Sequence, residues 1–188
     1  MMRTPAAFFF SKDEDLVQNV VNCLMPTHYT GVAIESAVCY AYALAAAAKG
    51  CDMQTILEEA CKGAALGKPH GSQLRVAAAA PSCAARIRFL NTIIPQMKDE
   101  EEVKTFLYDV IGSTQESCDC CACAFALFMY AKEDVHLAIR LATEMGGDTD
   151  TIACLAAGLC TLYAGRHNLP EEMVSLVSSA NRLDFDEL

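Results

Sequence analysis

Residues 135–163 of the chain read VHLAIRLATEM, then GGDTDT, then IACLAAGLCTLY. Apolar residues of the first part recur at spacings of three and four, as on one face of a helix: Val135, Ala138, Ala142 and Met145. Asp134 is suited to cap the start of this helix and Gly146 to end it. The apolar run that follows the glycine turn continues in the same manner up to Gly165. The stretch therefore predicts two helices, 135–145 and 149–164.

The same spacing recurs along nearly the whole chain, whereas alternating runs of Val, Ile, Thr and aromatic residues are nearly absent. The sequence therefore predicts an all-α fold, a compact helical bundle. The other predicted helices cover residues 14–24, 32–48, 52–64, 80–94, 100–111, 118–132 and 170–179. Two glycines and a proline interrupt the pattern at 66–72 and predict a long loop there.

Length and charge limit the classes of protein to which the chain can belong. Its 188 residues suffice for one hydrophobic core, so we expect a single domain over 1–188. The net charge is -10, with 14 basic residues scattered among 24 acidic ones, which argues against nucleic acid and anionic membrane surfaces as partners. No window holds the roughly 18 uninterrupted apolar residues that cross a bilayer. We expect a soluble, cytoplasmic protein, with the acidic runs 100–102 and 184–187 as solvated surface charge.

The chain contains eleven cysteines, an odd number without the repeated spacing of a disulfide framework. Most lie among alanines in predicted helices, as Cys39 and Cys154 do, so we expect small buried apolar residues in a reducing compartment. A denser group spans 118–123. On a helix, Cys118 and Cys121 share a face while the other two cysteines of this group point elsewhere, which argues against a tetrahedral zinc or iron-sulfur site.

The turn between the two helices of 135–164 is the strongest candidate for a functional site. Asp148, Asp150 and Thr151 place three hard oxygen donors at the N-terminal end of a helix, and such donors suit magnesium better than zinc. The simpler interpretation is that Asp148 or Thr149 caps the helix while Asp150 complements its dipole. A second candidate is His28, which precedes a predicted helix and is, by position alone, most simply a surface or capping residue.

The segment from Leu141 to Ala153, with its continuation to Gly165, resembles the C-terminal signature of the ADP-ribosylglycohydrolase family. Three shorter stretches agree in order and rough spacing. They are similar to the family's Met-Arg segment with a proline, to its Thr-His segment and to the stretch before its last motif, and they stand at Met2–Pro5, Thr27–His28 and Glu116–Ser117. Only the GGDTDT segment is specific on its own.

The resemblance implies an orthogonal helical bundle that binds two Mg²⁺ ions and hydrolyses an ADP-ribosyl glycosidic linkage. Asp148, Asp150 and Thr151 would be magnesium ligands, and the ions would hold the hydroxyls of the distal ribose and help to orient the attacking water. His28 would contact the diphosphate or adenosine side of ADP-ribose. The loop at Gly112 and Ser113 would line the same pocket with its backbone groups.

The chain departs from the family pattern in one respect. Family members carry, upstream, a glycine-rich phosphate loop, an acidic residue and a Thr-Asp-Asp cluster, and none of these is in the sequence. We therefore expect the C-terminal half of a family domain, incomplete at its N-terminus, in which a second chain or a second copy completes the metal site. The alternatives are a non-catalytic, ADP-ribose-binding or structural, crystallin-like member, and a truncated fragment of a longer enzyme. The segment around Arg3 looks one residue short, so Arg3 receives no role.

Overall fold

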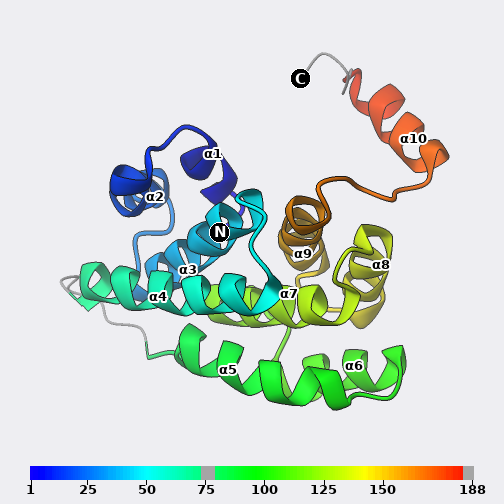
Figure 1. Cartoon of the computed structure of the whole chain (residues 1–188), viewed down its shortest axis with the longest axis horizontal. Helices are drawn as coiled ribbons and strands as arrows, with labels where there is room; N and C mark the ends of the chain where they lie inside the picture. The colour runs from blue at the N-terminus through cyan, green and yellow to red at the C-terminus, as the bar shows by residue number, and fades with distance from the viewer. Residues whose placement is uncertain (73–78, 184–188) are drawn as a thin grey trace.

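The computed structural model of the protein describes residues 1–72 and 79–183. Within these ranges every regular element is a helix, which confirms the all-α prediction (Figure 1). The α-helices are α1 (Thr4–Phe9), α2 (Leu16–Leu24), α3 (Gly31–Ala48), α4 (Met53–Ser72), α5 (Cys83–Ile93), α6 (Glu100–Phe106), α7 (Ser117–Ala131), α8 (Val135–Met145), α9 (Thr149–Ala164) and α10 (Glu171–Asn181).

Two helices, α3 and α7, form the centre of the molecule. Both are apolar on all sides and are buried along most of their length, as expected of helices enclosed by others. Among the described helices, α3 alone is long and apolar enough to cross a membrane, with Glu35 as its one charged residue, but 78% of it is buried within the protein. Its composition is therefore that of a core helix.

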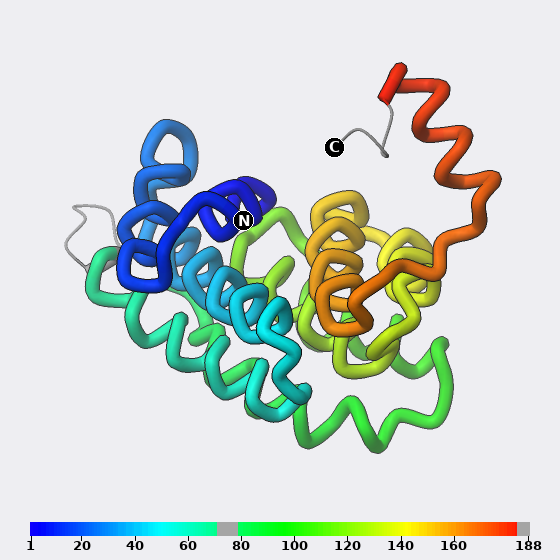
Figure 2. Tube along the Cα trace, turned by 45° about the horizontal axis from the view of Figure 1, so that its top comes forward, coloured from blue at the N-terminus to red at the C-terminus, as the bar shows by residue number. Residues whose placement is uncertain are grey.

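Close packing between α3 and α4 explains why the loop predicted at 66–72 is wrong. In the structure α4 continues through this segment to Ser72, and Pro69 lies inside the helix. A Cβ atom added to Gly63 would lie 2.6 Å from the carbonyl oxygen of Val38, and one added to Gly67 would lie 3.0 Å from that of Ile34. The glycines allow two helix backbones to approach each other and do not make a turn (Figure 2).

The α8–α9 pair has the bounds that the sequence predicts, 135–145 and 149–164. Asp134 caps α8 by accepting a hydrogen bond from the backbone N–H of Leu137 at 2.9 Å. The hydroxyl of Tyr40 in α3 donates to the carbonyl oxygen of Leu155 in α9 at 2.9 Å. A Cβ atom on Gly158 would lie 2.7 Å from that hydroxyl, so this glycine too permits close packing. The core thus fixes α9, whose first turn carries the candidate site.

Some predicted bounds are wrong at the ends of helices. Helix α1 was not predicted, and the helix predicted over 14–24 begins with a 3₁₀ turn at Asp13–Asp15. The helix predicted over 80–94 begins only at Cys83, after Ser82 caps it. The last part of the helix predicted over 100–111 is a π-helical segment, Leu107–Ile111. The other ends differ by one or two residues, except at α4.

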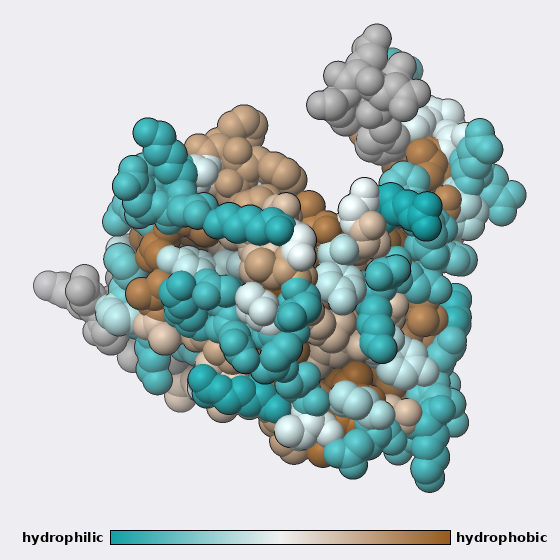
Figure 3. Space-filling model, viewed as in Figure 1, coloured by the Kyte–Doolittle hydropathy of each residue, from teal (hydrophilic) through white to brown (hydrophobic). Residues whose placement is uncertain are grey.

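The last helix, α10, lies outside the bundle. None of its residues is buried, and Figures 1 and 2 show it standing away from α8 and α9. Hydrophobic side chains are visible on its surface in Figure 3. The acidic run predicted at 184–187 lies outside the described residues.

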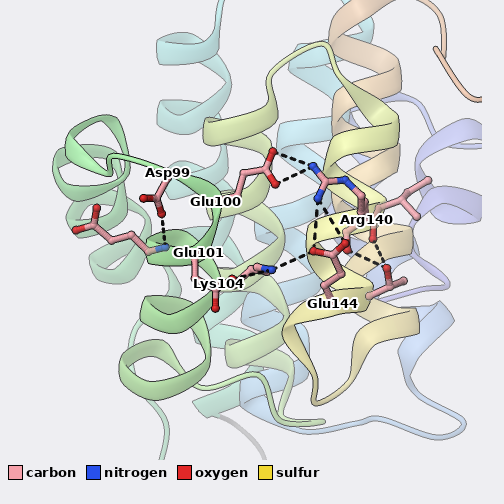
Figure 4. A network of polar contacts seen from close by, with 9 residues as sticks. Asp99, Glu100, Glu101, Lys104, Arg140 and Glu144 are labelled. Carbon is pink, nitrogen blue, oxygen red and sulfur yellow. Dashed lines mark hydrogen bonds and ion pairs between the residues drawn. The ribbon is translucent and has the colours of Figure 1, made fainter.

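The sequence predicted that the acidic residues at 100–102 are solvated surface charge, but in the structure they form ion pairs and a hydrogen bond. Glu100 forms an ion pair with Arg140 of α8, in which both carboxylate oxygens of Glu100 lie 2.8 Å from Nη2 of Arg140 (Figure 4). Lys104 lies 3.0 Å from both Glu101 and Glu144, so the network joins α6 to α8. Glu102 instead accepts a hydrogen bond from the backbone N–H of Lys98 near the start of α6.

The prediction that most cysteines are small buried residues is confirmed. All eleven are free thiols, and seven of them are buried: Cys39, Cys83, Cys118, Cys120, Cys121, Cys123 and Cys160. Cys154, predicted to be buried, is exposed, because it faces outward from α9.

Candidate functional site

Two glycines build the turn that connects α8 to α9. Gly146 and Gly147 have backbone φ angles of +90° and +83°, in a region that residues other than glycine rarely adopt. After them the N–H of Asp148 donates to the carbonyl oxygen of Ser113 at 2.8 Å. A Cβ atom added to Gly147 would lie only 2.1 Å from that same oxygen. The turn is therefore pressed against the loop that precedes α7.

Asp148 is the first residue of interest at this turn. It occupies the capping position of α9, but its side chain forms no capping hydrogen bond, so the simpler interpretation does not describe it. Instead the thiol of Cys120 in α7 donates to Asp148 Oδ2 at 3.2 Å. Burial, followed by the hydrogen bond to Asp148, raises the pKa of the Cys120 thiol well above its usual range. The thiol is thus protonated at neutral pH, and the other carboxylate oxygen keeps its capacity to bind a ligand.

A cavity of about 380 Å³ lies beside Asp148, a volume within the range of small-molecule sites. Four parts of the chain form its wall: the N-terminal segment, the end of α2 with the connection to α3, the start of α7, and the start of α9. The lining residues are Met1, Met2, Arg3, Leu24, His28, Gln115, Ser117, Cys120, Asp148 and Thr151.

The cavity brings together three of the residues that the sequence singled out, His28, Asp148 and Thr151. Asp148 and Thr151 are three positions apart on α9 and so share one face of it. The hydroxyl of Thr151 also lies 3.5 Å from the sulfur of Met2. His28 is exposed at the cavity wall, and its Nδ1 lies 2.7 Å from the hydroxyl of Thr27.

Asp150 lies elsewhere. It is exposed, it is absent from the cavity wall, and its position two residues after Asp148 turns it to the other side of the helix. Partial burial of the sulfur, followed by the carboxylate of Asp150, raises the pKa of the Cys154 thiol. Gly112 and Ser113 also do not line the cavity; their loop supports it from behind through the contact between Ser113 and the glycine turn.

The donors at the cavity fit magnesium better than a transition metal. Asp148 and Thr151 offer hard oxygen atoms, and Mg²⁺ often binds through one or two carboxylates while it keeps several waters. Over the described ranges, no group of three or more His, Cys, Asp and Glu side chains could hold a metal ion. By themselves, the two residues would supply only part of the octahedral coordination sphere of such an ion.

An ion pair that was not predicted from the sequence holds the loop before α7. Arg86 Nη1 of α5 lies 2.6 Å from Asp119 Oδ1, and the same guanidinium donates to the carbonyl oxygens of Ile111 and Cys118 at 3.1 and 3.2 Å. The hydroxyl of Thr114 donates to the other oxygen of Asp119 at 2.7 Å. Both charged side chains are less than one-fifth exposed. The contacts of Arg86 and Asp119 therefore hold both ends of the loop before α7.

The sequence also missed Cys120 and Arg3 as cavity residues. Cys120 lies one turn into a helix of cysteines and alanines, where nothing in the pattern distinguishes it from its neighbours. Arg3 reaches the cavity because α1 folds back beside α3 (Figure 1).

The chain matches known proteins in two comparisons. The family model described as ADP-ribosylglycohydrolase matches residues 1–188. The chain is also similar to the Uncharacterized protein YegU of Escherichia coli (strain K12), with 27% identity over 173 residues, which is 92% of this chain and 51% of the relative. The chain thus spans about half the length of the curated relative that it matches.

Proposed function

The chain belongs to the ADP-ribosylglycohydrolase family, a family of hydrolases, and from this premise we propose that it acts in the magnesium-dependent hydrolysis of an ADP-ribosyl glycosidic linkage. The substrate is ADP-ribose attached to a residue or to a small molecule. The observation that carries the proposal is the position of Asp148: its side chain leaves the helix cap vacant and lines a cavity shared with Thr151 and His28.

Each side chain at the cavity has a distinct part in this proposal. Asp148 and Thr151 hold magnesium, which, when bound, supplies positive charge and orients the ribose hydroxyls. The cleaved bond leaves positive charge on the sugar ring, so the carboxylate of Asp148 is favourable beside it. Arg3 is the one Arg or Lys side chain among the described lining residues, and with His28 it is suited to bind the diphosphate.

We propose that a second polypeptide, either another chain or a second copy, completes the donor set. The chain spans half of its relative, and a single carboxylate at the cavity is less than the two-ion site of the family requires.

A second candidate function follows from the same observation. We propose as this second function that the chain binds ADP-ribose at the cavity without hydrolysing it, since the described residues assemble no group of three potential His, Cys, Asp or Glu metal ligands. This reading keeps the roles of Arg3, His28 and Asp148 in binding. The two functions differ only in whether the bound linkage is cleaved.

The test is calorimetric and thermal titration of the purified chain with Mg²⁺ and ADP-ribose, separately and together. We expect the unfolding temperature to rise most when both are present, because ligands that bind only the folded state stabilise it. Asp148→Asn keeps the shape of the side chain and removes its charge, so it should abolish the increment that needs both ligands.

The matched control is Asp109→Asn, because Asp109 is an exposed carboxylate that does not line this cavity. It should leave the increment unchanged. If neither ADP-ribose alone nor both ligands together raise the unfolding temperature of the unmodified chain, both candidate functions are refuted. If the increment is present, release of ADP-ribose from an ADP-ribosylated substrate separates the hydrolase from the binding protein.

A further inference from the structure

Asp148 stands where an aspartate normally caps a helix. Its φ and ψ angles of -82° and 62° are similar to the -88° and 88° of Asp134, which caps α8. The carboxylate of Asp134 accepts a hydrogen bond from the N–H three residues later, that of Leu137, at 2.9 Å. The matching bond, from the N–H of Thr151 to the side chain of Asp148, is not formed. Because aspartate is among the strongest capping residues, another contact must hold this carboxylate away from the cap.

The contact that holds it is with Cys120. Among the described residues, the carboxylate of Asp148 has this thiol as its one hydrogen-bond partner, with the sulfur 3.2 Å from Oδ2. The sulfur also lies 3.2 Å from the carbonyl oxygen of Thr114. A thiol has a single proton, and a charged carboxylate is a stronger acceptor than a carbonyl oxygen. The thiol therefore donates chiefly to Asp148, with Thr114 as its second acceptor.

The core fixes Cys120 in place. The residue is 2% exposed and lies on α7, which is buried along most of its length. Its side chain nevertheless forms part of the cavity wall, beside Asp148 and Thr151. A donor on this central helix cannot follow the carboxylate if the carboxylate turns toward the first turn of α9. The thiol thus favours the orientation in which Asp148 faces the cavity and the cap is vacant.

We propose that Cys120 is a positioning residue, whose thiol holds the carboxylate of Asp148 at the cavity and out of the helix cap. This role rests on the proposed function, in which Asp148 is a magnesium ligand. A ligand that a neighbouring donor has already oriented binds its ion more tightly than one that must first leave a cap. Without the thiol, Asp148 should turn and accept a hydrogen bond from the N–H of Thr151.

NMR spectroscopy measures this orientation without any metal. In proton–nitrogen correlation spectra of the metal-free chain, Cys120→Ala should move the amide proton of Thr151 downfield and slow its exchange with water, because that N–H gains a carboxylate as acceptor. Adding Asp148→Ala to the same variant should remove both changes. A Thr151 amide that is the same in Cys120→Ala as in the unmodified chain would overturn the proposal.

Cys123→Ala is the matched control. Cys123 also lies on α7, is fully buried and donates to a carbonyl oxygen of the same loop, that of Gly112, at 3.3 Å. It has no hydrogen bond to Asp148, so only Cys120→Ala should change the Thr151 amide. A change of equal size in Cys123→Ala would assign the effect to lost core packing, and the proposal would fall. Circular dichroism checks that both variants fold.

Titration with Mg²⁺ in the presence of ADP-ribose measures what the orientation contributes to binding. Cys120→Ala should weaken Mg²⁺ binding about tenfold, as loss of a group that orients a metal ligand commonly does. Cys123→Ala should leave the affinity unchanged, and Cys120→Ser, which keeps a donor, should recover part of the loss. Equal affinity in Cys120→Ala and the unmodified chain would overturn the positioning role. If the unmodified chain binds no Mg²⁺, the proposed magnesium site is refuted instead, and the NMR spectra still decide whether Cys120 orients Asp148.

Discussion

The backbone N–H of Asp148 donates a hydrogen bond to the carbonyl oxygen of Ser113 at 2.8 Å, although the two residues lie on opposite sides of α7 in the sequence. This bond connects the turn before α9 to the loop before α7. It requires a close approach of two backbones, which Gly147 permits. The position of the Asp148 side chain in the cavity therefore depends on a residue that has no side chain.

Gly147→Ala should destabilise the protein strongly. The φ angle of +83° costs a side-chain-bearing residue about 1–3 kcal/mol. The new Cβ atom would also lie 2.1 Å from the carbonyl oxygen of Ser113, so the backbone must shift. We expect the free energy of unfolding to fall by about 3 kcal/mol or more, measured by urea denaturation.

Gly165→Ala is the matched control for this change. Its φ angle is +69°, but no atom lies within 4 Å of an added Cβ. The free energy of unfolding of this variant should fall only by the cost of the left-handed backbone conformation, about 1 kcal/mol. Equal losses in the two variants would show that contact with Ser113 does not determine the cost.

Arg86→Met should also weaken the protein, because it removes the charge that balances Asp119 while keeping most of the side-chain volume. The carboxylate would remain in a site where it is 13% exposed, with Thr114 as a remaining partner. Loss of one partner of a buried pair costs about 3–5 kcal/mol, and partial exposure reduces this, so we expect about 2–3 kcal/mol. Urea denaturation measures the loss.

Lys49→Ala provides the comparison for that experiment. Lys49 pairs with Asp13, but the two side chains are 59% and 77% exposed. An exposed pair of this kind contributes little, so the change should stay within about 0.5 kcal/mol. If Arg86→Met were equally mild, the ion pair would not be what holds the loop before α7.

Most of the fold was predictable from the sequence because helix periodicity and helix ends are local properties. Asp134 caps α8 and Gly165 ends α9, and both helices have their predicted bounds. The failures occur where a glycine or proline has a tertiary role. Gly67 interrupts the local pattern, but it lies against α3, and this packing keeps α4 helical through Pro69.

The candidate site was predictable only in part. The glycine turn and its resemblance to a family pointed to Asp148 and Thr151, both of which line the cavity. The sequence could not show that Cys120 meets Asp148, because this contact depends on how α7 lies beside α9. The spacing of two residues between Asp148 and Asp150 on one helix did indicate different sides of the helix, but the resemblance to the family placed both at the metal site. The ion pair of Arg86 and Asp119 joins residues 33 positions apart and left no local pattern.

Thr4→Val should stabilise the protein. Thr4 is 1% exposed, and its hydroxyl oxygen has no hydrogen-bond partner among the described residues. Valine has nearly the same shape and lacks the hydroxyl, so the cost of burying an unpaired polar group disappears. We expect a gain of about 1 kcal/mol and a higher melting temperature.

The control for Thr4→Val is Ser36→Ala. Ser36 is fully buried, but its hydroxyl donates to the carbonyl oxygen of Val32 at 2.8 Å. Removing a satisfied hydroxyl should lower stability by about 1 kcal/mol. A loss in Thr4→Val, equal to that in Ser36→Ala, would mean that Thr4 has a bonding partner in solution.

The stability of the protein should fall as the pH rises from 8 to 10. Burial, followed by the carboxylate of Asp119, raises the pKa of the Cys123 thiol to about 12, and burial followed by Asp134 raises the pKa of Cys160 to about 12. An unfolded thiol has a pKa of about 8.5. Above that pH the unfolded chain releases protons that the folded chain retains, so unfolding becomes easier. Each such thiol contributes a slope of about 1.4 kcal/mol per pH unit. Urea denaturation under reducing conditions measures the slope of the free energy of unfolding against pH. Cys160→Ala should reduce this slope by the contribution of one thiol. A free energy of unfolding that stays constant from pH 8 to 10 would show that these thiols ionise in the folded protein as they do in water.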